Sequence, residues 1–150
     1  MAQLFDIREA VLDDAGNLVQ LLHDFGHPAT EANLRQRLMA LDEDGVSCTW
    51  VAERARGELV GLAAAYLTRS VVFDTPTAQL TALVTAADAR GTGVGSALCV
   101  TFERWAVLRG AGAAVLTSAH ERRVAHTFYE HRGYDSSGLR FSKLLKSNGS

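Results

Sequence analysis

The spacing of apolar positions changes along the first third of the chain. Residues 5–8 alternate between apolar and polar in the manner of a short strand. Asp13 or Asp14 can then N-cap a helix that Gly26 ends, and Thr30 can N-cap a second helix. The apolar positions that share one face are Leu18, Leu22 and Phe25 in the first helix, and Leu34, Leu38 and Leu41 in the second. The pattern predicts one strand followed by two helices.

Strand-like runs dominate the middle of the chain. Residues 48–53 and 58–68 are joined by a short glycine-containing turn, so we expect them to pair antiparallel. A third apolar run, 79–84, leads into a glycine-rich turn and a long helix that Gly110 and Gly112 stop. The apolar positions expected on the buried face of this helix are Val94, Leu98, Phe102, Trp105 and Leu108.

The last third of the chain predicts a strand, a helix and another strand. Residues 113–117 form a short apolar run suited to a central strand, and a helix follows over about 121–131. Gly133 can close that helix in the left-handed conformation, and residues 139–145 supply a last strand. This order of elements predicts an α/β fold with a sheet of mixed direction and helices on both faces.

Composition narrows the class of protein. With 150 residues, 47% hydrophobic and 21% charged, the chain can bury one sizeable core. We therefore expect one domain over residues 1–146 and a polar tail over residues 147–150. The formal net charge of -2 lacks the basic bias of proteins that bind nucleic acid, so nucleic acid is not an expected partner.

Targeting signals and cysteines indicate the compartment. Charged residues interrupt the first ten positions, and no run approaches the roughly 20 apolar residues that a membrane span requires. We therefore expect no membrane association. Cys48 and Cys99 match no disulfide framework, so a reduced cytoplasmic setting with two buried thiols is expected.

The glycine-rich turn at residues 90–95 has the features of an anion site. A helix N-terminus offers unpaired N–H groups and the positive end of the helix dipole. The groups that can contribute are Arg90 by its charge, Gly91, Gly93 and Gly95 by their bare backbone, and Thr92 and Ser96 by their hydroxyls. Glycines also serve ordinary strand-to-helix turns, so spacing alone leaves both interpretations open.

Two common nucleotide motifs do not fit this turn. A Walker A loop requires a Gly-Lys pair, and the sequence has none. A Rossmann fingerprint requires glycine or alanine at position 96 and an acidic residue about 20 positions later. The chain has Ser96 and then the apolar pair Val115 and Leu116.

Two motifs together resemble the GNAT acetyltransferase superfamily. Its cofactor signature, Arg/Gln-x-x-Gly-x-Gly/Ala between an apolar strand and a long helix, is matched by Arg90, Gly93 and Gly95. A later helix with Ala-x-x-x-Tyr, then Gly and an aromatic residue, is matched by Ala125, Tyr129, Gly133 and Tyr134. The resemblance covers nearly the whole chain. It implies a mixed, mostly antiparallel twisted sheet of about six to seven strands with a splayed central pair, and acetyl-CoA as co-substrate. Separately, the five histidines form no tight ligand set and have no Cys or acidic partner at metal spacing, so no metal is expected.

The resemblance also implies residue roles. Leu83, Val84 and Thr85 would line the pantetheine arm, and a backbone N–H near Val84 would polarise the thioester carbonyl. The residues implied to bind the pyrophosphate are Arg90, Gly91, Thr92, Gly93, Val94, Gly95 and Ser96. Tyr129 would be the general acid that protonates the leaving CoA thiolate. One departure is Arg122, which stands where many relatives have a cofactor-contacting asparagine; Arg122 or Arg123 could instead meet a CoA phosphate.

The general base is the larger departure. Many relatives carry Glu or Asp on the strand before the signature, whereas this chain has Thr81 and Ala82, and Gln79 cannot act as a base. The side chains that remain open for this role, directly or through a water molecule, are His23, Asp24, His27, Asp74 and His120. A neutral amine or a water chain to bulk solvent would require no dedicated residue.

Three functions follow from these observations. The first is acetyl transfer from acetyl-CoA to a primary amine by direct attack in a ternary complex, with a small molecule or a peptide as acceptor. The second, suggested by the missing carboxylate, is a non-catalytic acyl-CoA-binding sensor or interaction module. The third is an α/β protein without a CoA site. The sequence does not identify the acceptor, which could be a protein N-terminus, a lysine, a polyamine, an amino acid or an aminoglycoside. A homodimer is also possible, because family members often dimerise.

Overall fold

A computed structural model of the protein describes residues 4–117, 123–138 and 140–145. The chain divides into two compact units, Met1–Leu116 and Thr117–Ser150. The first unit contains a sheet of five strands, and the second contains a helix. The division into one domain and a short tail stays a prediction.

The elements follow the predicted order. The strands are β1 (Phe5–Glu9), β2 (Ser47–Arg54), β3 (Glu58–Thr68), β4 (Thr77–Thr85) and β5 (Ala113–Leu116). The helices are α1 (Ala15–Phe25), α2 (Glu31–Glu43), α3 (Val94–Leu108) and, in the second unit, α4 (Arg123–His131). Three short 3₁₀ helices, η1 (Leu12–Asp14), η2 (Ala55–Gly57) and η3 (Ala87–Ala89), connect them.

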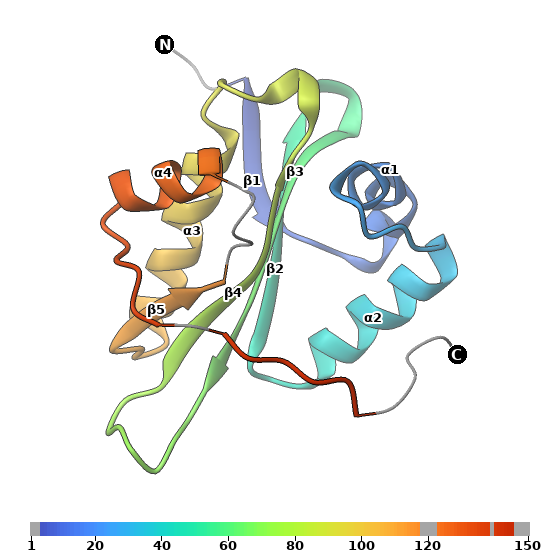
Figure 1. The fold of residues 1–150 in the computed structure, drawn as a ribbon. Helices are drawn as coiled ribbons and strands as arrows, with labels where there is room; N and C mark the ends of the chain where they lie inside the picture. Colours follow the sequence, from blue (N-terminus) through green and yellow to red (C-terminus); the bar gives the residue numbers. More distant parts are fainter. Residues whose placement is uncertain (1–3, 118–122, 139, 146–150) are drawn as a thin grey trace. The chain divides into compact units, whose positions relative to one another are not determined.

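The sheet is of mixed direction, as predicted. The strands lie in the order β1-β2-β3-β4-β5; the first four pair antiparallel, and β5 pairs parallel to β4. The parallel pair follows from the crossover through α3, because two parallel neighbours require a long connection. Within the first unit, α1 and α2 cover one face of the sheet and α3 covers the other (Figure 1).

The predicted number of strands is not confirmed. The structure describes five strands, not six to seven, because residues 140–145 form no strand. Leu139, where the last strand was expected to begin, lies outside the described residues. Apolar residues in a short run adopt a strand only when a neighbouring backbone pairs with them, and the sequence pattern does not specify that partner.

The core of the first unit consists of one layer on each face of the sheet. On the α3 side, Val94, Leu98 and Phe102 are fully buried against the sheet. On the α1–α2 side, the buried helix residues are Ala15, Leu18, Leu21, Leu34 and Leu38. Leu108 was expected on the buried face of α3 but is 86% exposed. It is the last residue of α3 and lies two positions after the buried Ala106, so its side chain is on the opposite side of the helix from the sheet.

The helix termini agree with the predicted caps, with one exception. Gly26 ends α1 with φ 94°, and the Thr30 hydroxyl accepts a hydrogen bond from the Asn33 N–H at the start of α2. The carboxylate of Asp14, the residue before α1, does not cap the helix. It accepts two hydrogen bonds from Arg8 and one from the Val11 N–H, and these bonds hold its pKa below the usual range.

The two cysteines differ in environment. Cys99 is fully buried, as predicted. Cys48 is only partly buried, and its thiol donates to Glu9 Oε1 at 3.3 Å. Burial and the neighbouring carboxylate raise the pKa of Cys48 to about 12, so the thiol is protonated at neutral pH.

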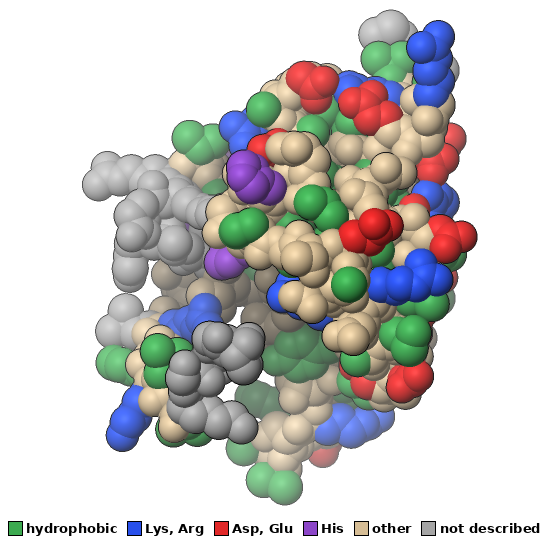
Figure 2. Space-filling view, turned by 90° about the vertical axis from the view of Figure 1, so that its right-hand side faces the viewer, with side chains coloured by type: hydrophobic (Ala, Val, Ile, Leu, Met, Phe, Trp, Pro, Cys, Tyr) green, Lys and Arg blue, Asp and Glu red, His purple; other side chains and the backbone are tan. Residues whose placement is uncertain are grey.

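Charges on the surface of the first unit are mixed in sign. The side turned to the viewer in Figure 2 carries acidic and basic side chains interspersed with apolar ones. This distribution agrees with the formal net charge of -2. No helix among the residues that the structure describes is long and apolar enough to cross a membrane.

Candidate active site

The turn between η3 and α3 has the backbone conformation of a ligand cradle. Gly91 and Gly93 have φ values of 79° and 93°, a region that other residues adopt only with strain. A Cβ built on either glycine would have no other heavy atom within 4 Å. The glycines are therefore required by the backbone and not by a tight contact, and their exposed faces leave room for a bound group.

The start of α3 supplies hydrogen-bond donors beside this turn. The Ala97 N–H donates to the Gly93 carbonyl oxygen at 3.0 Å, which is the first bond of the helical pattern. The N–H groups of Val94, Gly95 and Ser96 precede it and have no partner within the helix. Unpaired N–H groups and the positive end of the helix dipole at such a terminus can attract an anion.

The polar side chains of the turn contribute unequally. The Thr92 hydroxyl donates to the Ala89 carbonyl oxygen, and the Thr92 N–H donates to the same oxygen at 3.3 Å. The hydroxyl that was expected to donate to a phosphate therefore closes the turn. Arg90 is exposed and Ser96 is partly buried, so the guanidinium of Arg90 can reach a bound anion.

Gly61 on β3 allows α3 to approach the sheet at this end. A Cβ at Gly61 would lie 2.6 Å from Val94 Cγ1, 3.0 Å from Leu98 Cδ1 and 3.2 Å from Ala52 Cβ. Any other residue would push the first turn of α3 outward. Sequence reasoning missed this role, because a glycine inside a strand signals a close approach without identifying what approaches.

The end of β4 is free of β5. The β4–β5 ladder covers Thr77–Ala113 to Leu80–Leu116, whereas β4 continues to Thr85. Within the part of the first unit that is described, residues 82–85 therefore pair with β3 on one side only. This open edge contains the predicted cofactor-binding residues Leu83, Val84 and Thr85.

The direction of the backbone groups along this edge follows from the register. The Ala86 N–H donates to the Val60 carbonyl oxygen at 2.8 Å. Because backbone groups alternate along a strand, those of Val84 face Leu62 on β3, and those of Leu83 and Thr85 face the open edge. Val84 also buries its side chain on the α1–α2 side. An N–H that reaches a ligand here belongs to Leu83 or Thr85, the neighbours of Val84.

Thr81 marks an irregularity in β4. The β3–β4 register shifts between Ala64 and Ala65, so that Thr81 has no partner residue opposite it. Its hydroxyl donates to the Ala64 carbonyl oxygen at 3.0 Å. The position where relatives carry a carboxylate is thus occupied by a hydroxyl that satisfies the bulged backbone.

Tyr129 lies in the second unit, on α4. Its ring contacts Phe128 and Tyr134, with centroid distances of 5.4 and 6.0 Å. Gly133 ends the helix region with φ 89°, and the Tyr134 N–H donates to the Tyr129 carbonyl oxygen at 3.0 Å. The predicted left-handed glycine is confirmed, whereas the role of Tyr129 as general acid stays a prediction.

The candidate bases that the structure describes have surface environments. Asp24 accepts a hydrogen bond from Gln20, and His23 Nδ1 lies 3.6 Å from Asp24 Oδ1. His27 stacks on Phe25 with a centroid distance of 5.3 Å, and Asp74 lies in the exposed connection between β3 and β4. His120 and Arg122 lie outside the described residues. No group of three or more His, Cys, Asp or Glu in the described ranges could hold a metal ion.

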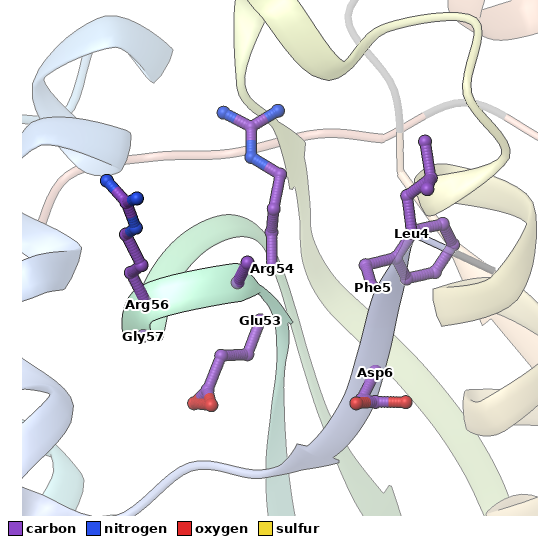
Figure 3. Close-up of a pocket in the computed structure, with 8 residues that line it drawn as sticks. Leu4, Phe5, Asp6, Glu53, Arg54, Arg56 and Gly57 are labelled. Carbon is purple, nitrogen blue, oxygen red and sulfur yellow. The ribbon is translucent and has the colours of Figure 1, made fainter.

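A hollow lies on the surface near the end of the sheet that leads into the glycine turn. It has a volume of about 330 Å³ and is lined by residues 4–6 and 53–57, at the start of β1 and along the β2–β3 connection (Figure 3). None of the predicted cofactor-binding residues lines it. Half of its lining residues are charged, and Arg54 is one of them.

Comparison with known proteins identifies the family. The sequence pattern of the Acetyltransferase (GNAT) family matches residues 12–134, which include the turn, the open end of β4 and Tyr129. The chain belongs to this family. GNAT members share the fold described above, and the predicted resemblance is confirmed.

Individual curated relatives match this chain only in part. The mouse (Mus musculus) protein "N-acetyltransferase family 8 member 3" is 31% identical over 105 residues, which are 67% of this chain and 46% of that protein. The chain therefore spans about half the length of the curated relatives that it matches.

Solved structures with low sequence identity share the fold. A Bacillus halodurans C-125 structure described as a transcriptional regulator has a TM-score of 0.86 at 24% identity, covering 94% of this chain and 99% of that chain. Glucosamine-6-phosphate N-acetyltransferase from Arabidopsis thaliana has a TM-score of 0.81 at 17% identity, covering 95% and 99%.

Proposed function

We propose that this GNAT protein is an N-acetyltransferase that transfers the acetyl group of acetyl-CoA to a primary amine by direct attack in a ternary complex. The observation that carries the proposal is the turn with left-handed Gly91 and Gly93, which opens α3 beside the unpaired end of β4. Bound acetyl-CoA would supply an acetyl group activated as a thioester. The acceptor would be a small-molecule or peptide amine.

The residues of the chain would divide the work as follows. Gly91, Gly93 and the first N–H groups of α3 bind the pyrophosphate, with Arg90 adding a positive charge. The N–H of Leu83 or Thr85 donates to the thioester carbonyl oxygen and stabilises the negative charge that develops there. The amine nitrogen forms a bond to the carbonyl carbon and loses a proton to one of the candidate bases or to water, and the C–S bond breaks. Tyr129 then donates a proton to the leaving thiolate sulfur.

The second candidate is an acyl-CoA-binding sensor without turnover. The observation that favours it is Thr81, because its hydroxyl is bound to the Ala64 carbonyl oxygen where many relatives place a carboxylate. Both candidates bind acetyl-CoA. Only an enzyme releases free thiol in the presence of an amine, so thiol release across a broad amine panel distinguishes the two.

Binding at the turn is tested with Gly93→Val and a matched control, Gly110→Val. Gly110 lies beyond the other end of α3, also has positive φ (81°), and also has nothing within 4 Å of a built Cβ. Both variants strain the backbone to a similar degree. We expect acetyl-CoA binding, measured by calorimetry, to be lost in Gly93→Val and retained in Gly110→Val. Equal affinities in the two variants would refute the assignment of the pyrophosphate to this turn.

A further inference from the structure

Arg54 joins three segments at the end of the sheet where the turn lies. Its Nη2 donates to Asp88 Oδ2 on η3 at 2.9 Å and to Glu58 Oε1 at the start of β3 at 2.8 Å. Its Nε donates to Glu58 Oε2 at 3.0 Å. Figure 3 shows the Arg54 side chain pointing away from that of its neighbour Glu53, which is bound to Arg8 instead. Arg54 is the last residue of β2, and its side chain therefore connects the end of β2 to the chain between β4 and α3.

The segment that Arg54 reaches leads directly into the glycine turn. Asp88 lies two residues before Arg90. The same 3₁₀ helix is held by the Ala86 N–H on the Val60 carbonyl oxygen and by Ala89, which is 2% exposed. Thr92 in turn binds the Ala89 carbonyl oxygen through its hydroxyl and its N–H. A displacement of η3 is thus transmitted to the glycines.

We propose that Arg54 is a positioning residue for CoA binding, an inference that rests on the proposed function. By holding Asp88, Arg54 fixes η3 and therefore the cradle formed by Gly91 and Gly93. Arg54 is suited to this task because its planar guanidinium can bind two carboxylates at once. Its side chain is 29% exposed, so it does not depend on burial in the core. Its effect acts through the turn and not through contact with the acetyl group.

Arg56 provides a matched control within the same connection. It is an arginine two residues further along, and its replacement changes the net charge by the same amount. No hydrogen bond or ion pair is recorded between Arg56 and the other residues that the structure describes. Both variants lose one positive charge near an anion site, so this effect cancels when Arg54→Ala is compared with Arg56→Ala. The remaining difference in affinity reports the contact with Asp88.

The test measures acetyl-CoA affinity by calorimetry on the full chain at a temperature where circular dichroism shows every variant folded. We expect the Kd of Arg54→Ala for acetyl-CoA to be about three- to five-fold higher than that of Arg56→Ala, which is the range expected for loss of a solvent-exposed ion pair. With an accepted amine, the KM for acetyl-CoA should rise by the same factor while kcat stays unchanged. Arg54→Lys should recover part of the affinity, because one ammonium can hold one carboxylate.

A double-mutant cycle with Asp88→Asn completes the test. Once Arg54 is replaced by alanine, Asp88→Asn should cause no further loss of affinity, because the contact is already absent. Equal Kd values for Arg54→Ala and Arg56→Ala, or losses that simply add in the cycle, would overturn the inference. Failure of the wild-type chain to bind acetyl-CoA would instead refute the proposed function, so the two failures are distinguishable.

Discussion

Replacing Gly61 with alanine puts a methyl group against the first turn of α3. The new Cβ would lie 2.6 Å from Val94 Cγ1 and 3.0 Å from Leu98 Cδ1, well inside normal contact distance. Val94 is 1% exposed and β-branched, so it has little freedom to rotate away within a helix. The start of α3 must therefore move away from the sheet, and the donors of the glycine turn move with it.

The cost of this substitution follows from two opposing effects. Overpacking a core typically destabilises by about 1 to 3 kcal/mol. Replacing glycine by alanine restricts the unfolded chain and recovers about 0.4 to 1 kcal/mol. We therefore expect a net loss of about 1 to 2 kcal/mol, which corresponds to a decrease in Tm of about 2 to 8 °C for a chain of this size. Acetyl-CoA affinity should fall as well.

Thermal and urea unfolding, followed by circular dichroism, measure the loss. The matched variant is Gly61→Ala combined with Val94→Ala, which removes the side chain that the new methyl group meets first. The combined variant should be less destabilised than the sum of the two single variants, because each substitution makes room for the other. Unchanged stability in Gly61→Ala, or additive losses in the pair, would refute the close approach of α3 to β3.

Three further predictions concern other parts of the molecule. Tyr129→Phe should lower the maximal rate and leave the acetyl-CoA affinity nearly unchanged, whereas Tyr134→Phe, at the neighbouring ring, should retain the rate; equal rates for Tyr129→Phe and wild type would contradict the general acid. Asp14→Asn should destabilise by about 1 to 3 kcal/mol at pH 7, since Arg8 loses a partly buried partner. The pKa of Asp14 is lowered in the folded state, so its contribution to the free energy of unfolding is present above the unfolded pKa of about 4 and is lost as pH falls through the folded pKa. Urea unfolding at pH 7 and pH 3 should therefore show a smaller stability difference between wild type and Asp14→Asn in acid. Cys48, with its pKa raised to about 12, should react slowly with iodoacetamide at pH 8, and Glu9→Gln should accelerate the reaction; an unchanged rate would contradict the contact.

Local patterns were sufficient to predict most of the first unit. The period of Val94, Leu98 and Phe102 predicted the buried face of α3, because a helix packed on a sheet buries every third or fourth residue. The glycines at 91 and 93 predicted the turn, because each adopts a conformation that other residues avoid.

Features that depend on distant partners could not be predicted. Gly61 and Val94 lie far apart in sequence, as do Arg54 and Asp88, and nothing local links them. Asp14 has the residue type of a helix cap, but Arg8 binds its carboxylate. In this case a tertiary contact prevailed over the usual role of the residue. The Thr92 hydroxyl donates to the Ala89 carbonyl oxygen, and its role toward a phosphate stays a prediction.

The central claim is acetyl transfer to an amine, and thiol release measures it most directly. The full chain is incubated with acetyl-CoA and a panel of primary amines, including peptides, polyamines, amino acids and aminoglycosides, and free CoA thiol is quantified together with acetylated amine by mass spectrometry. We expect at least one amine to accelerate thiol release, with one acetylated amine formed per thiol. Binding of acetyl-CoA without amine-dependent thiol release across the whole panel would contradict it.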